Sequence, residues 1–170
     1  PERVLILSGD HVYKMDYSHF VRYHQNKRSD MTISGIEVDI SEASRFGVIH
    51  TGSDSRVIGF EEKPEEPRPM PGAPDKAFVS MGVYVFKRDV LIDMLTRDAQ
   101  SEGSFHDFAR DLIPFMYPRN RVFVYRFGAG KGRKQVDADR VLPRGEARQA
   151  RVPLVAAVVL VVVAAESHDA

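Results

Sequence analysis

Cysteine and tryptophan are absent from this 170-residue chain, and neither sign of charge predominates in it. Without cysteine, the chain can form neither a disulfide framework nor a thiolate metal site, and we expect a reducing, cytoplasmic location. Twenty-four basic residues balance twenty-four acidic ones, so the formal net charge is zero. Such a balance provides no general attraction to nucleic acids or anionic membranes. We therefore expect neither of these as a partner.

Clustered histidines and long apolar runs are also missing. The six histidines are scattered and no HExxH pattern occurs, which excludes the zinc site of that pattern. The uncharged apolar run from Leu154 to Ala165 is shorter than the roughly 20 residues that a membrane-spanning helix needs. No initiator methionine is present, and Pro1 directly precedes a strand-like run. We interpret the chain as an internal fragment of a longer protein.

What is present is a globular composition with an alternating α/β pattern. Hydrophobic residues make up 43% of the chain and charged residues 28%, which is typical of a folded domain. The pattern predicts an α/β domain with a mixed sheet over residues 1–127. We expect strands at 4–7, 31–38, 47–51, 57–63, 78–86 and 121–127, a helical turn at 41–44, and helices at 17–27, 88–96 and 105–116.

Local signals define several boundaries of these elements. Asp16 is placed to cap the first helix, and residues 52–55 suit the loop of a hairpin. Residues 64–74 are dense in proline and charge, which predicts a loop. In the helix at 88–96, we expect Val90, Leu91 and Leu95 to share the buried side.

After Phe127 the pattern is lost, and we expect residues 128–170 to form a separate, poorly ordered tail. The valine-rich run at 154–165 combines high β-propensity with no charge, which favours an aggregation-prone segment over a strand or helix packed on the domain. Three explanations fit this change of pattern. The gene could be read out of frame from this point, the chain could contain a recombinant junction, or the tail could simply have diverged.

Five stretches of the α/β region stand out as motifs. They are VLILSGDHVYKMDY at 4–17, FGV at 46–48, FEEKP at 60–64, SMGVYVF at 80–86 and SFHDFARDLIP at 104–114. In this order and at about this spacing, they resemble stretches of bacterial glucose-1-phosphate adenylyltransferases. The resemblance covers residues 1–127 and implies a partial Rossmann-like nucleotidyltransferase domain.

The resemblance implies a reaction and its ligands. ATP and α-D-glucose 1-phosphate would give ADP-glucose and pyrophosphate, with Mg²⁺ as cofactor, in glycogen biosynthesis. The full-length parent is expected to be a homotetramer. Two alternatives remain open at this point: another sugar-1-phosphate nucleotidyltransferase, and a non-catalytic fragment or subunit.

In this interpretation, two charged residues would bind the metal ion and the sugar phosphate. Asp10 follows a buried strand, where ligands bind in open α/β sheets, and its carboxylate suits Mg²⁺ as the metal-binding catalytic residue. The alternative is a turn-forming aspartate. Lys63 ends a strand, where its ammonium can meet the sugar phosphate. The alternative is a surface lysine paired with Glu61 or Glu62.

Three further residues would line the sugar pocket. The resemblance gives Glu62 to the sugar hydroxyls, from which a carboxylate can accept hydrogen bonds. Gly47 would let the backbone approach the ligand closely, or else mark a strand bend. Ser80 would offer its hydroxyl, or else serve as a small residue beside Gly82. We expect His106 and Asp107 to cap the following helix instead of taking part in chemistry.

Other parts of the family pattern do not occur in this chain. These are the glycine-rich loop with its Arg-Leu pair that grips ATP, the Trp-Arg-Asp-Val-Gly stretch with a second metal-binding aspartate, and the carboxy-terminal β-helix domain. Because catalysis of phosphoryl transfer depends on such groups, we expect the isolated chain to be inactive.

Overall fold

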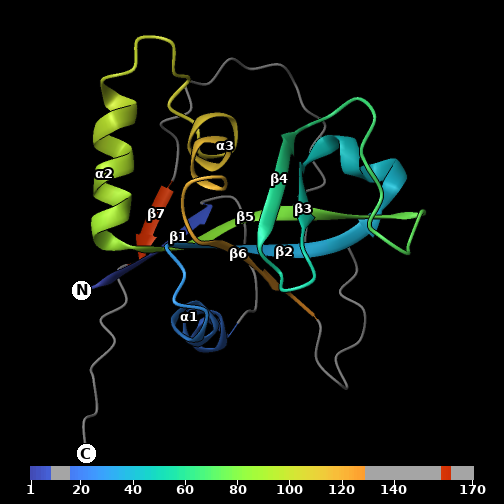
Figure 1. Ribbon diagram of the computed structural model, residues 1–170, viewed down its shortest axis with the longest axis horizontal. Coiled ribbons are helices and arrows are strands. Elements are labelled where there is room, and N and C mark those ends of the chain that lie inside the picture. The colour runs from blue at the N-terminus through green and yellow to red at the C-terminus, as the bar shows by residue number, and fades with distance from the viewer. Residues whose placement is uncertain (9–15, 129–157, 162–170) are drawn as a thin grey trace, which may run out of the picture.

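A computed structural model describes residues 1–8, 16–128 and 158–161 (Figure 1). The strands are β1 (Arg3–Ser8), β2 (Met31–Asp39), β3 (Gly47–Thr51), β4 (Val57–Glu62), β5 (Lys76–Lys87), β6 (Val122–Arg126) and β7 (Val158–Val161). The helical elements are α1 (Tyr17–Asn26), the 3₁₀-helix η1 (Ile40–Arg45), α2 (Arg88–Ala99), the π-helical turn η2 (Phe108–Leu112) and α3 (Ile113–Met116).

The described strands form one mixed sheet organised around β5. Strand β5 pairs with β2 along most of its length, and β2 pairs in parallel with β6. On its other edge β5 pairs with β3 at one end and with β1 at the other, both antiparallel. One strand therefore holds together the β3–β4 hairpin, the amino-terminal strand and the β2–β6 pair.

Helices cover both faces of this sheet (Figure 1). Alternate residues of β1 and β5 point to opposite faces, as the two-residue period of a strand requires. On one face, Ile6 and Phe86 pack with Leu91 of α2 and Ile113 of α3. On the other face, Leu5, Val83 and Val85 pack with Phe20 and Val21 of α1. The result is a three-layer α/β arrangement with a core on each side of the sheet.

Most of the expected elements are confirmed. Asp16 caps α1, because its carboxylate accepts a hydrogen bond from the backbone N–H of Ser18 at 3.0 Å. The β3–β4 hairpin has the expected loop, and β1 is buried at Val4, Leu5 and Ile6. The mixed α/β fold class is therefore correct.

Two helix predictions need correction. Leu95 is 43% exposed, whereas Met94 is buried, because the arc of α2 that faces the sheet is centred between Leu91 and Met94 and leaves Leu95 at its margin. The helix expected from Phe105 begins only at Phe108, and its first turn is π-helical. Phe105 itself is 68% exposed.

The tail expected at 128–170 lies outside the described residues, apart from Gly128 and β7. Strand β7 pairs antiparallel with the free edge of β1, with Leu5 opposite Val161 and Ser8 opposite Val158. The structure thus has the packed-strand alternative at Val158–Val161. The physical reason is that an open strand edge presents unpaired N–H and C=O groups to which β-branched residues can add.

His24 is a buried polar residue between α1 and the sheet, with only 1% of its surface exposed. Its Nδ1 lies 2.8 Å from the hydroxyl oxygen of Thr32. Burial, together with the positive charges of Arg3 and Lys87, lowers the pKa of His24 to about 4. The imidazole is therefore neutral in the fold at neutral pH.

This depressed pKa predicts a loss of stability in acid. The unfolded chain takes up the proton near the ordinary pKa of about 6.5, so stability falls as the pH drops from there toward 4. Denaturant unfolding in phosphate-free buffer should show that His24→Asn removes on the order of 2–3 kcal/mol of this pH dependence. His19→Asn, at an exposed histidine of the same helix, is the control. Identical pH profiles for the chain and His24→Asn would contradict the assignment.

Candidate sugar-phosphate site

The site is built on an irregularity in β5. Ile33 of β2 is opposite Tyr84, but Gly35 is opposite Ser80, so one residue of β2 faces three residues of β5. Gly82, in the middle of this bulge, has a φ of 69°, which a residue without a Cβ adopts readily. The bulge lies between the segments of β5 that pair with β3 and with β1. It therefore opens the sheet at a point where side chains can meet a ligand.

Ser80 and Tyr84 project from this bulge. The Ser80 hydroxyl accepts a hydrogen bond from the Gly82 N–H at 3.2 Å, as expected for a small residue beside Gly82. Burial raises the pKa of Tyr84 to about 12, although a hydrogen bond with Ser80 opposes the shift and the charges of Asp107 and Glu62 increase it. Tyr84 therefore stays protonated. Its hydroxyl has Ser80 as a hydrogen-bond partner and the carboxylates of Asp107 and Glu62 nearby.

Gly47 and Glu62 face each other at the open end of the β3–β4 hairpin. A Cβ on Gly47 would lie 2.4 Å from the Phe60 ring and 3.1 Å from Oε2 of Glu62. No larger residue fits there unless the Phe60 ring moves. Packing alone therefore explains why residue 47 is glycine, because a glycine leaves room for the Phe60 ring and the Glu62 carboxylate.

Lys63 follows directly and leaves the hairpin in an unusual conformation. Its φ is 46°, in the left-handed region that a residue before proline rarely adopts. A hydrogen bond from its N–H to the carbonyl of Phe46, at 3.0 Å, ties it to the start of β3. Its ammonium lies 3.6 Å from the Glu62 carboxylate and its side chain is 65% exposed. The lysine therefore combines a fixed backbone with a cation that is open to solvent.

The entry to η2 brings a second carboxylate to the site. The Asp107 side chain accepts hydrogen bonds from the N–H groups of Ala109 and Arg110, at 2.7 and 2.9 Å, so its expected capping role is confirmed. The next residue, Phe108, stacks on Tyr84 with the ring centroids 5.6 Å apart. This stacking places η2 against the bulge of β5.

The electrostatics of Glu62 reflect this gathering of charges. Burial raises the pKa of the Glu62 carboxyl above its ordinary value, and the negative charge of Asp107 raises it further. The cations of Lys63 and Arg110 oppose this rise. A carboxylate that is half withdrawn from water and flanked by a cation suits recognition of hydroxyl groups next to a phosphate.

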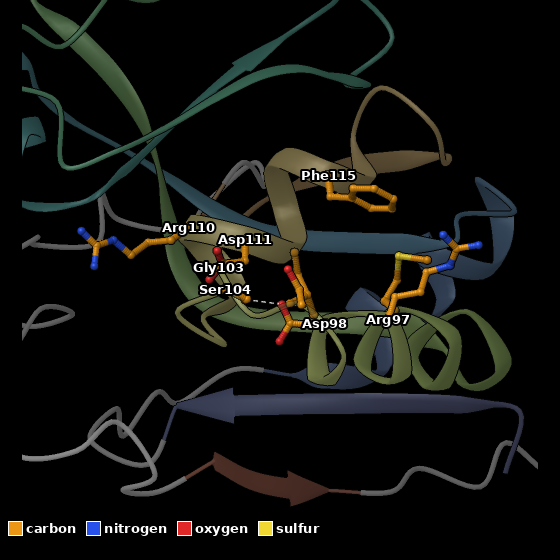
Figure 2. A pocket seen from close by; sticks show the side chains of 10 residues that line it. Arg97, Asp98, Gly103, Ser104, Arg110, Asp111 and Phe115 are labelled. Atoms are coloured by element: carbon orange, nitrogen blue, oxygen red, sulfur yellow. Dashed lines mark hydrogen bonds between the residues drawn. The ribbon is translucent and has the colours of Figure 1, made fainter.

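A cavity of about 380 Å³ lies beside this site, between the carboxyl-terminal half of α2 and the η2–α3 segment (Figure 2). Ser104 donates a hydrogen bond to Asp98 at 2.5 Å in its wall, and Nδ1 of His106 lies 2.8 Å from the same carboxylate. These hydrogen bonds hold the pKa of Asp98 below its ordinary value. His106 therefore does not cap the helix as expected, but ties the preceding loop to α2.

The structure thus brings together most, but not all, of the residues named from the sequence. Glu62, Lys63 and Ser80 belong to one group, with Gly47 beside Glu62. Asp10 lies outside the described residues. Within the described ranges, no group of three His, Cys, Asp or Glu side chains could hold a metal ion.

Sequence reasoning missed Tyr84 and Arg110, and it gave Asp107 a capping role alone. The signal for Tyr84 was its place four residues after Ser80, which puts both on one side of a strand. No sequence signal placed Asp107 near Glu62, because that proximity depends on how η2 packs against β5.

The proximity of these charges can be tested through the titration of Glu62. Asp107→Asn keeps the helix cap but removes a negative charge, so the pKa of Glu62 should fall. Lys63→Gln removes a cation, and the pKa should rise. Asp93→Asn, on the exposed side of α2, is the control and should have no effect. Carboxyl ¹³C NMR measures each value, and an unchanged pKa in Asp107→Asn would show that the two carboxylates are not neighbours.

Comparison with known proteins identifies relatives of this chain. Among curated relatives, a glucose-1-phosphate adenylyltransferase 1 of Vibrio vulnificus is 47% identical over 131 residues, which are 77% of this chain and 32% of the relative. A glucose-1-phosphate adenylyltransferase of Nitrosospira multiformis is 52% identical over 127 residues, 75% of this chain and 30% of the relative. The chain thus spans about a third of the length of these relatives.

A family model described as nucleotidyl transferase matches residues 1–132. That match ends five residues after Phe127, where the sequence pattern changes. It includes β1 to β6 and every described residue of the site. The chain therefore belongs to the nucleotidyl transferase family.

Proposed function

We propose that this chain is the sugar-phosphate-binding part of a glucose-1-phosphate adenylyltransferase. In this reaction a phosphate oxygen of α-D-glucose 1-phosphate attacks the α-phosphorus of ATP. The bond from that phosphorus to the β-phosphate oxygen breaks, so that ADP-glucose forms and pyrophosphate leaves. The observation that carries the proposal is the grouping of Glu62, Lys63, Ser80 and Tyr84 where β4 ends and β5 bulges. The names of the relatives supply the substrate class.

Each residue of the site has a part in binding. The exposed Lys63 ammonium would pair with the phosphate of the sugar, and its neighbour Glu62 would accept hydrogen bonds from sugar hydroxyls. Ser80 would donate or accept a further hydrogen bond. Gly47 would allow the backbone of the hairpin to approach the sugar closely. Together these groups would orient the attacking phosphate.

We assign Mg²⁺ to Asp10 as part of the same proposal. Strand β1 ends at Ser8, two residues past the Ile6–Tyr84 pair and two residues before Asp10 in the sequence. Magnesium commonly binds one or two protein carboxylates and completes its coordination with water and substrate phosphates, which suits a single aspartate. When bound, the ion would neutralise charge on the phosphates.

A second candidate function is a non-catalytic sugar-phosphate-binding fragment or subunit. It would use the same Glu62, Lys63 and Ser80 to hold the sugar phosphate, without transfer of a nucleotide. The proposal also includes a cytoplasmic location and a homotetrameric full-length parent. The absence of cysteine fits a reducing compartment. In the described ranges, no helix has the length and apolar character to cross a membrane.

Lys63 should govern affinity for the sugar phosphate. In a full-length enzyme that carries this segment, Lys63→Ala removes the cation that faces the phosphate. A charge-assisted hydrogen bond contributes about 1.5–3 kcal/mol, so the apparent affinity for glucose 1-phosphate should fall about tenfold to a hundredfold. The apparent affinity for ATP should change little. Steady-state kinetics with each substrate varied in turn measures both.

Lys76→Ala provides the control for this experiment, because Lys76 is paired with Asp39 at the start of β5, away from the bulge. It should leave both constants unchanged. If Lys63→Ala left the glucose 1-phosphate constant unchanged as well, Lys63 would be a surface lysine and the pocket assignment would be wrong.

The isolated 170-residue chain should be catalytically inactive or nearly so. It lacks the nucleotide-gripping loop and the second metal carboxylate of the family pattern, and phosphoryl transfer depends on positioning and charge neutralisation. The assay is pyrophosphate release from ATP and glucose 1-phosphate. Sustained ADP-glucose synthesis by the purified chain would contradict this prediction.

A further inference from the structure

The loop of residues 100–107, between α2 and η2, returns the chain to the sugar-phosphate site. Strand β5 carries Tyr84 at its bulge and continues directly into α2, so the chain first leaves the site along that helix. It comes back at η2, where Phe108 stacks on Tyr84 with the ring centroids 5.6 Å apart and contacts Phe86 at 5.9 Å. The position of η2 at the site therefore depends on how this loop is held.

Asp98, in the last turn of α2, holds the loop through both of its carboxylate oxygens. Its Oδ1 accepts a hydrogen bond from the Ser104 hydroxyl at 2.5 Å (Figure 2), and its Oδ2 lies 2.8 Å from Nδ1 of His106. The Ser104 oxygen in turn accepts a hydrogen bond from the N–H of His106 at 3.0 Å. The Asp98 side chain is only 13% exposed. One carboxylate therefore fixes the loop at two of its residues.

His106 forms the corner at which the loop ends and η2 begins. Its φ is 57°, in the left-handed region that residues other than glycine adopt infrequently. Such a conformation persists where the surrounding contacts hold it. The next residue, Asp107, caps η2, and its own N–H donates to the Asp111 carboxylate at 3.0 Å. The hydrogen bond between His106 and Asp98 therefore fixes the direction in which η2 starts.

The η2 segment brings charges to the sugar-phosphate site. The negative charge of Asp107 raises the pKa of Glu62, and the positive charge of Arg110 lowers it. Asp107 also acts on Tyr84. The Arg110 guanidinium stacks over the ring of Phe105, in the same loop, at 4.4 Å. A displacement of η2 would therefore change the surroundings of two site residues.

We propose that Asp98, Ser104 and His106 are positioning residues, whose hydrogen bonds hold η2 against the bulge of β5 and so keep the site in the form that binds the sugar phosphate. None of the three belongs to the group proposed to contact the sugar, and they act through η2. The consequence for binding rests on the proposed function. The position of η2 can be measured in the 170-residue chain without any ligand.

Four variants separate the hydrogen bonds from the backbone conformation. His106→Gly keeps the left-handed backbone, which glycine adopts readily, and removes the ring. Asp98→Ala removes the carboxylate. His106→Asn is the conservative variant: asparagine tolerates the left-handed region, and its amide can donate to Asp98 from the place of Nδ1. Asp93→Ala is the control, because Asp93 is 60% exposed on the same helix and pairs only with the exposed Arg97.

The first measurement is NMR of the labelled 170-residue chain. His106→Gly and Asp98→Ala should weaken the NOEs between the rings of Tyr84 and Phe108. They should also lower the pKa of Glu62, because η2 then covers its carboxyl less and Asp107 moves away. The conservative variant and the control should keep both values, and unchanged α1 amide shifts should show that each variant is folded. Unchanged NOEs and an unchanged pKa in both disruptive variants would overturn the inference.

The second measurement is steady-state kinetics of a full-length enzyme that carries this segment. His106→Gly and Asp98→Ala should raise the KM for glucose 1-phosphate about threefold to tenfold, because binding must then also order η2. The kcat and the KM for ATP should change little, and His106→Asn should restore the original KM.

Lys63→Ala, measured in the same series, separates this inference from the proposed function. If Lys63→Ala raised the KM for glucose 1-phosphate and the two disruptive variants did not, the positioning role would be overturned and the proposed function would stand. If Lys63→Ala also left this KM unchanged, the proposed function would be contradicted, and with it the consequence for binding. The NOEs would then decide alone whether the loop holds η2.

Discussion

The irregular pairing of β5 is the constraint on which the rest of the molecule depends. Three residues of β5 face one residue of β2, and β1 and β3 pair with β5 on either side of that bulge. The bulge separates the stretch of β5 that pairs with β3 from the stretch that pairs with β1. The left-handed Gly82 makes the interruption possible, and the Tyr84–Phe108 stacking fixes η2 beside it.

The amino-acid sequence predicts this fold well where local signals decide. The apolar run of β1, the Asp16 cap and the hairpin loop each depend on neighbours in sequence, and each was predicted correctly. The motifs also assign Lys63 and Ser80 to one site, and this assignment stays a prediction. The position of a β-bulge opposite Ser34 could not be predicted, because it depends on the register between β2 and β5.

Predictions were less successful where tertiary packing decides. Leu95 belongs to an apolar pattern, but the sheet contacts only the arc around Leu91 and Met94. His106 was expected at a helix cap, yet the helix starts later and its ring reaches Asp98 instead. The nearness of Asp107 to Glu62 follows from the same packing of η2, so no local pattern could have shown it.

Glu62, Lys63, Ser80 and Tyr84 are proposed to form one sugar-phosphate site. Chemical-shift mapping of the ¹⁵N-labelled chain during titration with glucose 1-phosphate can locate the bound ligand. The largest changes should fall on the backbone amides of Gly47, Glu62, Lys63 and Ser80. Changes scattered over the surface, or absent from the ends of β3 and β4 and the bulge of β5 at saturating ligand, would contradict it.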